Sequence, residues 1–155
     1  MMRRSRGHIT VSLLAASIMS ASADAAIPRE TGGILLGWCI RSGIHVSAAI
    51  EVPDPSSGFA SYSRDHSAAA ALLRGALADE PTDSPVGYVG EWHSHPAPSR
   101  PSHTDRKAMR RLALDAKGTV ALVVLARAAP WSHHGALYRR WTENLAEVQI
   151  EGSNR

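Results

Sequence analysis

The sequence predicts an α+β fold, a single domain in which helices pack on one β-sheet. The chain has 155 residues, about the length of one domain with a substantial core. Hydrophobic residues make up 44% and charged residues 20%, which is typical of globular proteins. Helical and strand-like apolar patterns follow each other in mixed order. We therefore expect one domain at residues 8–151, with disordered tails at 1–7 and 152–155.

The N-terminal segment allows two interpretations. Its basic residues, the apolar run Ile9–Met19 and the small residues up to Ala25 have the outline of a secretory signal peptide. The alternative is a strand at His8–Ser12 followed by a helix at about 13–25. Polar residues interrupt the apolar run, and no run of the chain reaches about 18 apolar residues, so no membrane span is predicted.

A β-hairpin is predicted next. The segment Glu30–Gly33 is typical of a turn, and the strands Ile34–Ile40 and Ile44–Val52 flank a second turn at Arg41–Gly43. Cys39 lies between apolar neighbours, so we expect it to be buried. As the only cysteine, it permits neither an intramolecular disulfide nor a cysteine-based zinc site.

After a Pro-, Ser- and Gly-rich loop at 53–65, a helix is predicted at 67–78 and a strand at 86–92. A second helix is expected at 102–117, followed by strands at 119–126, 136–141 and 146–151. The strand at 119–126 is apolar throughout, as expected for a central strand that is buried on both faces.

The charge pattern argues against a nucleic-acid partner. The formal net charge is +3, and the arginines are scattered with few aromatic residues between them. Fifteen of the seventeen basic residues are arginine, which is typical of a GC-rich bacterial genome.

Residues suited to zinc chemistry gather in Gly90–Asp105, GEWHSHPAPSRPSHTD. Because side chains alternate across a strand, His93 and His95 are expected to share one face while Ser94 points away. Asp105, in the first turn of the next helix, can supply a third ligand. Two histidines and one carboxylate leave the fourth tetrahedral position to water, which is the pattern of catalytic zinc.

Each of these motifs also has a purely structural interpretation. Ser102 and Asp105 have the spacing of a helix N-cap, and Glu30 could be a solvated acid in a turn. The combination of a strand that ends in His-x-His-Pro, a proline loop and Ser-x-x-Asp favours a metal site. The remaining histidines are expected on the surface or in the core: His8, His45, His66, His103, His133 and His134, the last two in a polar turn.

Together these motifs resemble the JAB/MPN (JAMM) metalloprotease family, in particular its small bacterial branch. The resemblance rests on Glu30–Gly37 (ETGGILLG), residues 90–96 (GEWHSHP) and Ser102–Asp105 (SHTD), and extends to about residue 126. It implies a curved mixed β-sheet flanked by helices, similar in outline to the cytidine deaminase fold. Six residues separate His95 from Ser102, one fewer than in the common family pattern.

The resemblance also implies the role of each motif residue. His93, His95 and Asp105 would hold one zinc ion per chain with a catalytic water. Glu30 would be the base that takes the proton of the water and passes it to the leaving amine. Ser102 would donate a hydrogen bond to the oxyanion.

Known members of the family cleave after the C-terminal Gly of ubiquitin or a ubiquitin-like protein, so the resemblance implies deconjugation or precursor processing. In the family the substrate tail lies extended against a sheet edge, and Phe59, Tyr62 and Trp92 are the candidates to contact it here. By analogy, activating (E1-like) and conjugating (E2-like) proteins of one operon would be partners, in bacterial ubiquitin-like conjugation or antiphage defence, in the cytoplasm and without a membrane partner.

Two alternatives remain open at this point. One is a secreted or phage-type zinc peptidase of the same family with another substrate, which requires the signal peptide. The other is a non-catalytic binding module that uses zinc only for structural stability.

Overall fold

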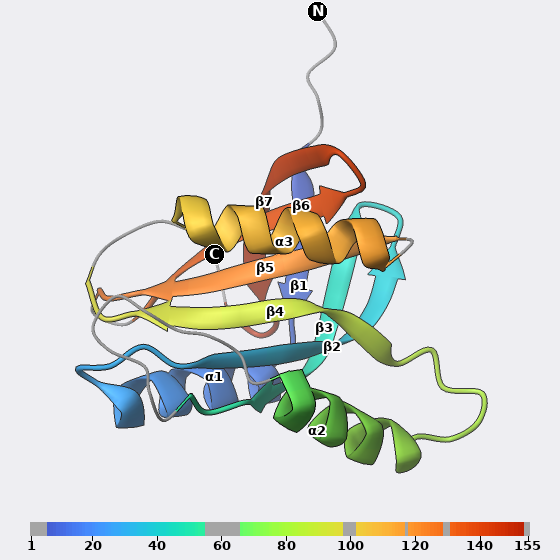
Figure 1. The fold of residues 1–155 in the computed structure, drawn as a ribbon, viewed down its shortest axis with the longest axis horizontal. Coiled ribbons are helices and arrows are strands. Elements are labelled where there is room, and N and C mark those ends of the chain that lie inside the picture. The colour runs from blue at the N-terminus through green and yellow to red at the C-terminus, as the bar shows by residue number, and fades with distance from the viewer. Residues whose placement is uncertain (1–5, 55–65, 98–101, 117, 129–130, 154–155) are drawn as a thin grey trace, which may run out of the picture.

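The structure is a computed structural model that describes residues 6–54, 66–97, 102–116, 118–128 and 131–153. It confirms the α+β class and the single mixed sheet (Figure 1). The elements, in chain order, are β1 (Gly7–Val11), α1 (Leu13–Ala26), β2 (Gly32–Ile40), β3 (Gly43–Glu51), α2 (His66–Ala78), β4 (Gly87–His95), α3 (His103–Asp115), β5 (Thr119–Ala126), β6 (Ser132–Arg139) and β7 (Thr142–Ile150).

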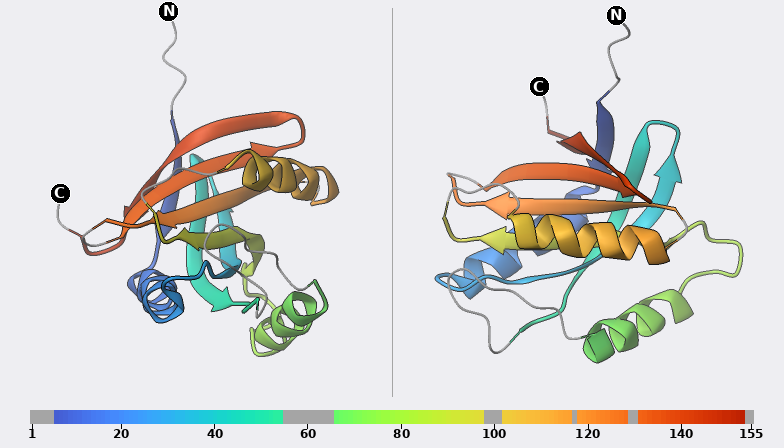
Figure 2. Two further views of the ribbon diagram at one scale, coloured as in Figure 1. Left: turned by 60° about the vertical axis from the view of Figure 1, so that its left-hand side comes forward. Right: turned by 45° about the horizontal axis from the view of Figure 1, so that its top comes forward.

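The sheet is curved and closes on itself. Its strand order is β1-β3-β2-β4-β5-β6-β7, and β1 pairs in parallel with both β3 and β7, which closes a barrel (Figure 2). The predicted central strand, β5, lies between β4, to which it is parallel, and β6, to which it is antiparallel. The curvature was predicted through the family resemblance, whereas the closure depends on strands at opposite ends of the chain and was not predicted.

The N-terminal segment forms the strand and helix of the second interpretation. Ser12 caps α1, because its hydroxyl accepts a hydrogen bond from the Ala15 N–H at 3.1 Å. The helix buries Ala15, Ala16, Met19 and Ala23. Cleavage after Ala25 would remove β1 from between β3 and β7 and take away most of this helix. In the part of the chain described here, no helix is long and apolar enough to span a membrane.

The two faces of β5 pack against different helices, which explains its unbroken apolar sequence. Ala121, Val123 and Leu125 belong to a core cluster with α1, and we call this side the α1 face. Val120, Leu122 and Val124 pack with Met109 and Ala113 of α3, and this side is the α3 face. Figure 1 shows α3 running along β5.

A β-bulge in β4 decides which residues of this strand point to the α3 face. Gly90 pairs with Leu35 and Tyr88 with Leu36, so Val89 is an extra residue. Gly90 has φ of +151°, and a Cβ at this position would lie 2.0 Å from the Ala121 carbonyl oxygen. Only glycine fits here, and the alternation of side chains is reset before the two histidines.

Two local predictions were wrong. Cys39 is exposed rather than buried, because the pairing of β2 with β4 ends at Gly37 and leaves Cys39 with a neighbouring strand on one side only. His133 and His134 lie half-buried in β6 rather than in a turn, because this strand begins at Ser132, four residues before the predicted start. The helix α3 ends at Asp115, close to the predicted position.

Candidate metal centre

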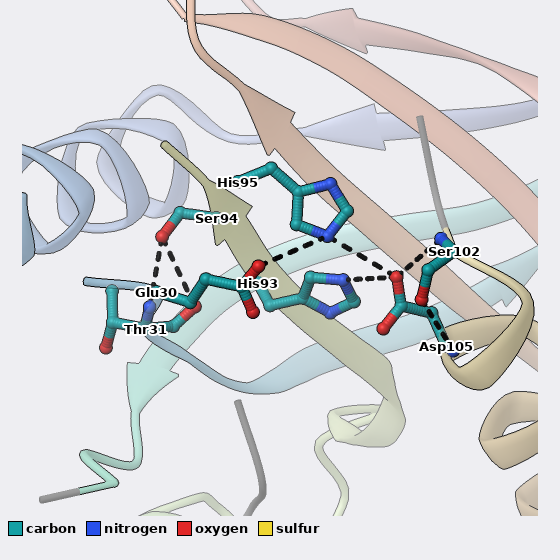
Figure 3. A network of polar contacts seen from close by, with 7 residues as sticks. All are labelled: Glu30, Thr31, His93, Ser94, His95, Ser102 and Asp105. Carbon is teal, nitrogen blue, oxygen red and sulfur yellow. Dashed lines mark hydrogen bonds and ion pairs between the residues drawn. The ribbon is translucent and has the colours of Figure 1, made fainter. Parts of the chain in front are cut away.

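The last residues of β4 bring two histidines to the α3 face. His93 and His95 lie on one side of the strand, as alternation predicts, with their ring centroids 4.9 Å apart (Figure 3). The neighbouring strands fix the backbone of this segment, since Gly32 of β2 and Val124 of β5 both pair with His93. Both histidines are buried, with 7% and 5% of their surface exposed.

Ser94, the residue between the two histidines, holds the segment that carries the candidate base Glu30. Ser94 donates its N–H to the Thr31 carbonyl at 2.8 Å, and its hydroxyl accepts the Thr31 N–H at 3.1 Å. The Thr31 hydroxyl in turn donates to Glu51 Oε1 at 2.7 Å. These bonds hold the segment before β2 against β4, so that Glu30 is buried with Oε1 4.0 Å from His95 Nε2. The sequence interpretation missed the roles of Thr31 and Glu51.

The N-terminus of α3 brings a carboxylate to the same place. Ser102 and Asp105 form a reciprocal capping box: the Ser102 hydroxyl accepts the Asp105 N–H at 3.1 Å, and Asp105 Oδ2 accepts the Ser102 N–H at 2.7 Å. The same Oδ2 atom lies 3.0 Å from His93 Nε2 and 3.4 Å from His95 Nε2. The structural interpretation of this motif therefore holds, and the cap also aims the carboxylate at the histidines (Figure 3).

The three side chains fit a zinc ion. One ligand atom from each of His93, His95 and Asp105 can be chosen so that all three lie within 4.8 Å of one another. Zinc bonds of about 2.0–2.1 Å in tetrahedral geometry separate ligand atoms by about 3.3 Å, close to the two distances from Asp105 Oδ2. Imidazole nitrogen and carboxylate oxygen are ligands that zinc prefers.

The electrostatics of the two carboxylates differ. Burial on its own would raise the pKa of Asp105, but hydrogen bonds from His93 and His95 hold that pKa well below its usual range. Burial raises the pKa of Glu30, and the neighbouring His95 and His93 oppose part of that rise. Asp105 is therefore suited to remain an anionic ligand, and Glu30 to take up and release a proton.

Of the three expected substrate contacts, the structure describes only one. Trp92 is fully buried in the α1-face cluster, and its indole N–H donates to the Ile50 carbonyl at 3.3 Å. Its prediction as a substrate contact is wrong, because alternation along β4 turns it away from the face that carries His93. Phe59 and Tyr62 lie outside the described residues.

A cavity borders the candidate base. It has a volume of about 320 Å³ and lies where the C-terminal end of α1 meets the segment before β2 and the end of β3. Its lining residues are Ser22, Ala25, Ala26, Arg29, Glu30, Thr31, Glu51, Pro53 and Asp54. Glu30 therefore lies between this cavity and His95.

Comparison with known proteins settles the family. The family described as prokaryotic homologs of the JAB domain matches residues 14–143. The chain belongs to this family. The solution structure of protein DSY2949 from Desulfitobacterium hafniense has the same fold, with a TM-score of 0.71 over 94% of each chain at 20% sequence identity. No curated protein matches the chain. This match confirms the resemblance that was based on the motifs between Glu30 and Asp105. The matched region begins within α1.

Proposed function

We propose that this JAB-domain protein is a zinc-dependent peptidase or isopeptidase. The observation that carries the proposal is the convergence of Asp105 Oδ2 on the Nε2 atoms of His93 and His95, at 3.0 and 3.4 Å, with Glu30 4.0 Å from His95. Three ligands with a buried carboxylate beside them match the requirements of metal-assisted hydrolysis, whereas a purely structural zinc site has four protein ligands.

The side chains would divide the work as follows. When bound by His93, His95 and Asp105, a zinc ion supplies a water of lowered pKa and polarises the carbonyl of the substrate. Glu30 would take the proton of the attacking water and deliver it to the leaving amine, a task that its raised pKa favours. Ser102 would donate its hydroxyl hydrogen to the negative charge that develops on the carbonyl oxygen. This donation is compatible with the cap, in which the Ser102 oxygen is the acceptor.

The proposed substrate is a ubiquitin-like protein, cleaved after its C-terminal Gly as a conjugate or a precursor. Support comes from the family motifs, which this chain carries at Glu30, His93, His95, Ser102 and Asp105. The cavity beside Glu30 offers room for a segment of a bound peptide chain. We place the enzyme in the bacterial cytoplasm, with E1-like and E2-like partners encoded in one conjugation or antiphage defence operon.

The first test is metal content, measured by mass spectrometry on wild type and His95→Ala purified side by side. We expect about one zinc per chain in the wild type and its loss in the variant. The matched control is His103→Ala, because His103 is exposed on α3 and lies outside the cluster. Equal zinc in all three proteins, or none in the wild type, would overturn the proposal.

Cleavage is tested next, on ubiquitin-like proteins that end in Gly and are fused to a reporter. Wild type is expected to release the reporter, while Glu30→Gln keeps its zinc and loses about 10²–10⁴-fold in rate, because only the proton acceptor is removed. A protein that binds zinc, cleaves none of the fusions and needs zinc to stay folded would instead be the non-catalytic binding module.

A further inference from the structure

The helix α3 contacts the barrel through two rows of side chains. Met109 and Ala113 are buried against β5 and β6. Arg106 and Arg110, one turn apart, reach the same carboxylate, that of Glu143 in β7. Arg106 donates to Glu143 Oε1 from Nε at 2.9 Å and from Nη2 at 2.5 Å, and Arg110 Nη2 lies 3.3 Å from Oε2. We call Arg106, Arg110 and Glu143 the α3 ion-pair cluster.

Glu143 is held as a partly buried anion. Its side chain is 15% exposed, whereas both arginine side chains are more than 40% exposed. Burial on its own would raise the pKa of Glu143, but Arg106 and Arg110 lower it below its usual value. Burial and the Glu143 carboxylate together raise the pKa of Tyr138, so that its hydroxyl keeps its proton beside the anion.

The cluster adjoins the candidate metal ligand on the helix. Arg106 directly follows Asp105, which lies in the first turn of α3. The α-helix turns by about 100° per residue and carries side-chain ends about 5–6 Å from its axis. A rotation of roughly 20° about this axis would therefore move Asp105 Oδ2 by about 2 Å. Metal–ligand distances are held within about 0.2 Å, so even a small rotation matters for zinc binding.

The apolar row alone does not fix this rotation well. Hydrophobic contact is non-directional, and Met109 belongs to the most adaptable apolar side chains. Two charged contacts one turn apart on a single carboxylate restrain both rotation and sliding of the helix. Hydrogen bonds between ions are also shorter and more directional than neutral ones.

From this geometry we infer that Glu143 is a positioning residue for the metal site: through Arg106 and Arg110 it sets the rotation of α3 at which Asp105 faces His93 and His95. This inference rests on the proposed function, because it assigns Glu143 to the zinc site of that function. Glu143 itself lies 37 residues from Arg106 in the sequence, and its ion pairs run to the two arginines rather than to the ligand atoms.

The test compares Glu143→Gln with Glu147→Gln, the matched control. Glu147 lies four residues further along β7 on the same side of the strand and is exposed. The dissociation constant for zinc is measured by chelator competition, well below the unfolding temperature of every variant. We expect Glu143→Gln to weaken zinc binding about 10–100-fold, the range found when indirect supports of a metal site are lost, and Glu147→Gln to leave it unchanged.

A second measurement needs no metal. The imidazole ¹⁵N signals of His93 and His95 report the nearby Asp105 carboxylate in the metal-free protein. They are expected to shift in Glu143→Gln and not in Glu147→Gln. If the wild type binds no zinc, the proposed function fails, while these signals still decide whether Glu143 positions Asp105.

Arg110→Ala provides a milder variant, because this exposed arginine makes only one of the contacts. We expect it to weaken zinc binding less than Glu143→Gln, with no further loss when the two changes are combined. A lowered unfolding temperature with unchanged zinc affinity and unchanged imidazole signals would overturn the inference, since Glu143 would then serve stability alone.

Discussion

The two halves of the candidate site are built on different supports. The strand half consists of Glu30, His93 and His95, all at most 9% exposed. The β2–β4–β5 ladder holds the histidines, and the hydrogen bonds between Thr31 and Ser94 hold Glu30 beside them. The helix half consists of Asp105, with a side chain 19% exposed, and Ser102, which is exposed. Backbone pairing fixes the first half, whereas a capping box and side-chain contacts fix the second.

The difference teaches where the site is rigid and where it is adjustable. A change to the ladder alters the barrel itself, so fold and site are lost together. A change to α3 can move one ligand while the barrel persists, because the helix packs on the outside of β5 and β6. Zinc would join the two halves, and its affinity would report how well the helix half is placed.

The largest effect is expected from Gly90→Ala in the strand half. The new Cβ would lie 2.0 Å from the Ala121 carbonyl oxygen at a φ of +151°, so the pairing of β4 with β5 must open. We expect a loss of about 3 kcal/mol or more in the free energy of unfolding, measured by denaturant titration. Gly87→Ala is the control in the same strand, because nothing lies within 4 Å of its added Cβ. Similar losses in both variants would show that the bulge is not rigid.

A smaller effect on the fold, but a large one on zinc, is expected from Asp105→Asn. Asparagine keeps an oxygen that can accept the Ser102 N–H, so the cap persists. Metal-free stability should fall by about 1–2 kcal/mol, because the hydrogen bonds with His93 and His95 lose the charge of the carboxylate. It removes the anionic ligand, and we expect zinc affinity to fall more than about 100-fold, beyond the range for indirect supports. Chelator competition and thermal unfolding of the metal-free variant measure the two effects. If stability fell as far as zinc affinity, the two halves would not be separable.

The sequence predicted the strand half better than the path of the chain around it. Alternation placed His93 and His95 on one face and Ser94 on the other, because this rule needs only neighbours along one strand. The same rule turns Trp92 away from the histidines, yet Trp92 was predicted as a substrate contact. The bulge at Gly90 and the pairing of β1 with β7 depend on partners far along the chain, which no local pattern reveals.

For the helix half, the sequence identified the motif residues but not how their side chains are arranged. The spacing of Ser102 and Asp105 indicated both a cap and a ligand, and the structure shows that one carboxylate oxygen can satisfy both descriptions. The role inferred for Glu143 could not be predicted, because no local sequence pattern around this residue indicates that it pairs with an arginine 37 residues away. Residues that aim a ligand from a distance are visible only once the fold is known.

The smallest effect is expected from Thr31→Val. Within the strand half, this variant tests the support of the base Glu30 separately from that of the ligands His93 and His95. Valine keeps the shape of threonine and the backbone bonds to Ser94, but it removes the hydrogen bond to Glu51 Oε1. Stability should fall by about 1–2 kcal/mol. Zinc affinity should stay within about twofold, because the lost hydrogen bond runs to Glu51, on the side of Thr31 away from the proposed zinc ligands, and the bonds to Ser94 persist. The rate of cleavage should fall while KM stays unchanged, since Glu30 loses the restraint on its neighbour. A loss of zinc affinity equal to the loss of rate would mean that Glu30 and the two histidines move as one rigid unit. The strand half would then be indivisible, and only the helix half could be changed separately.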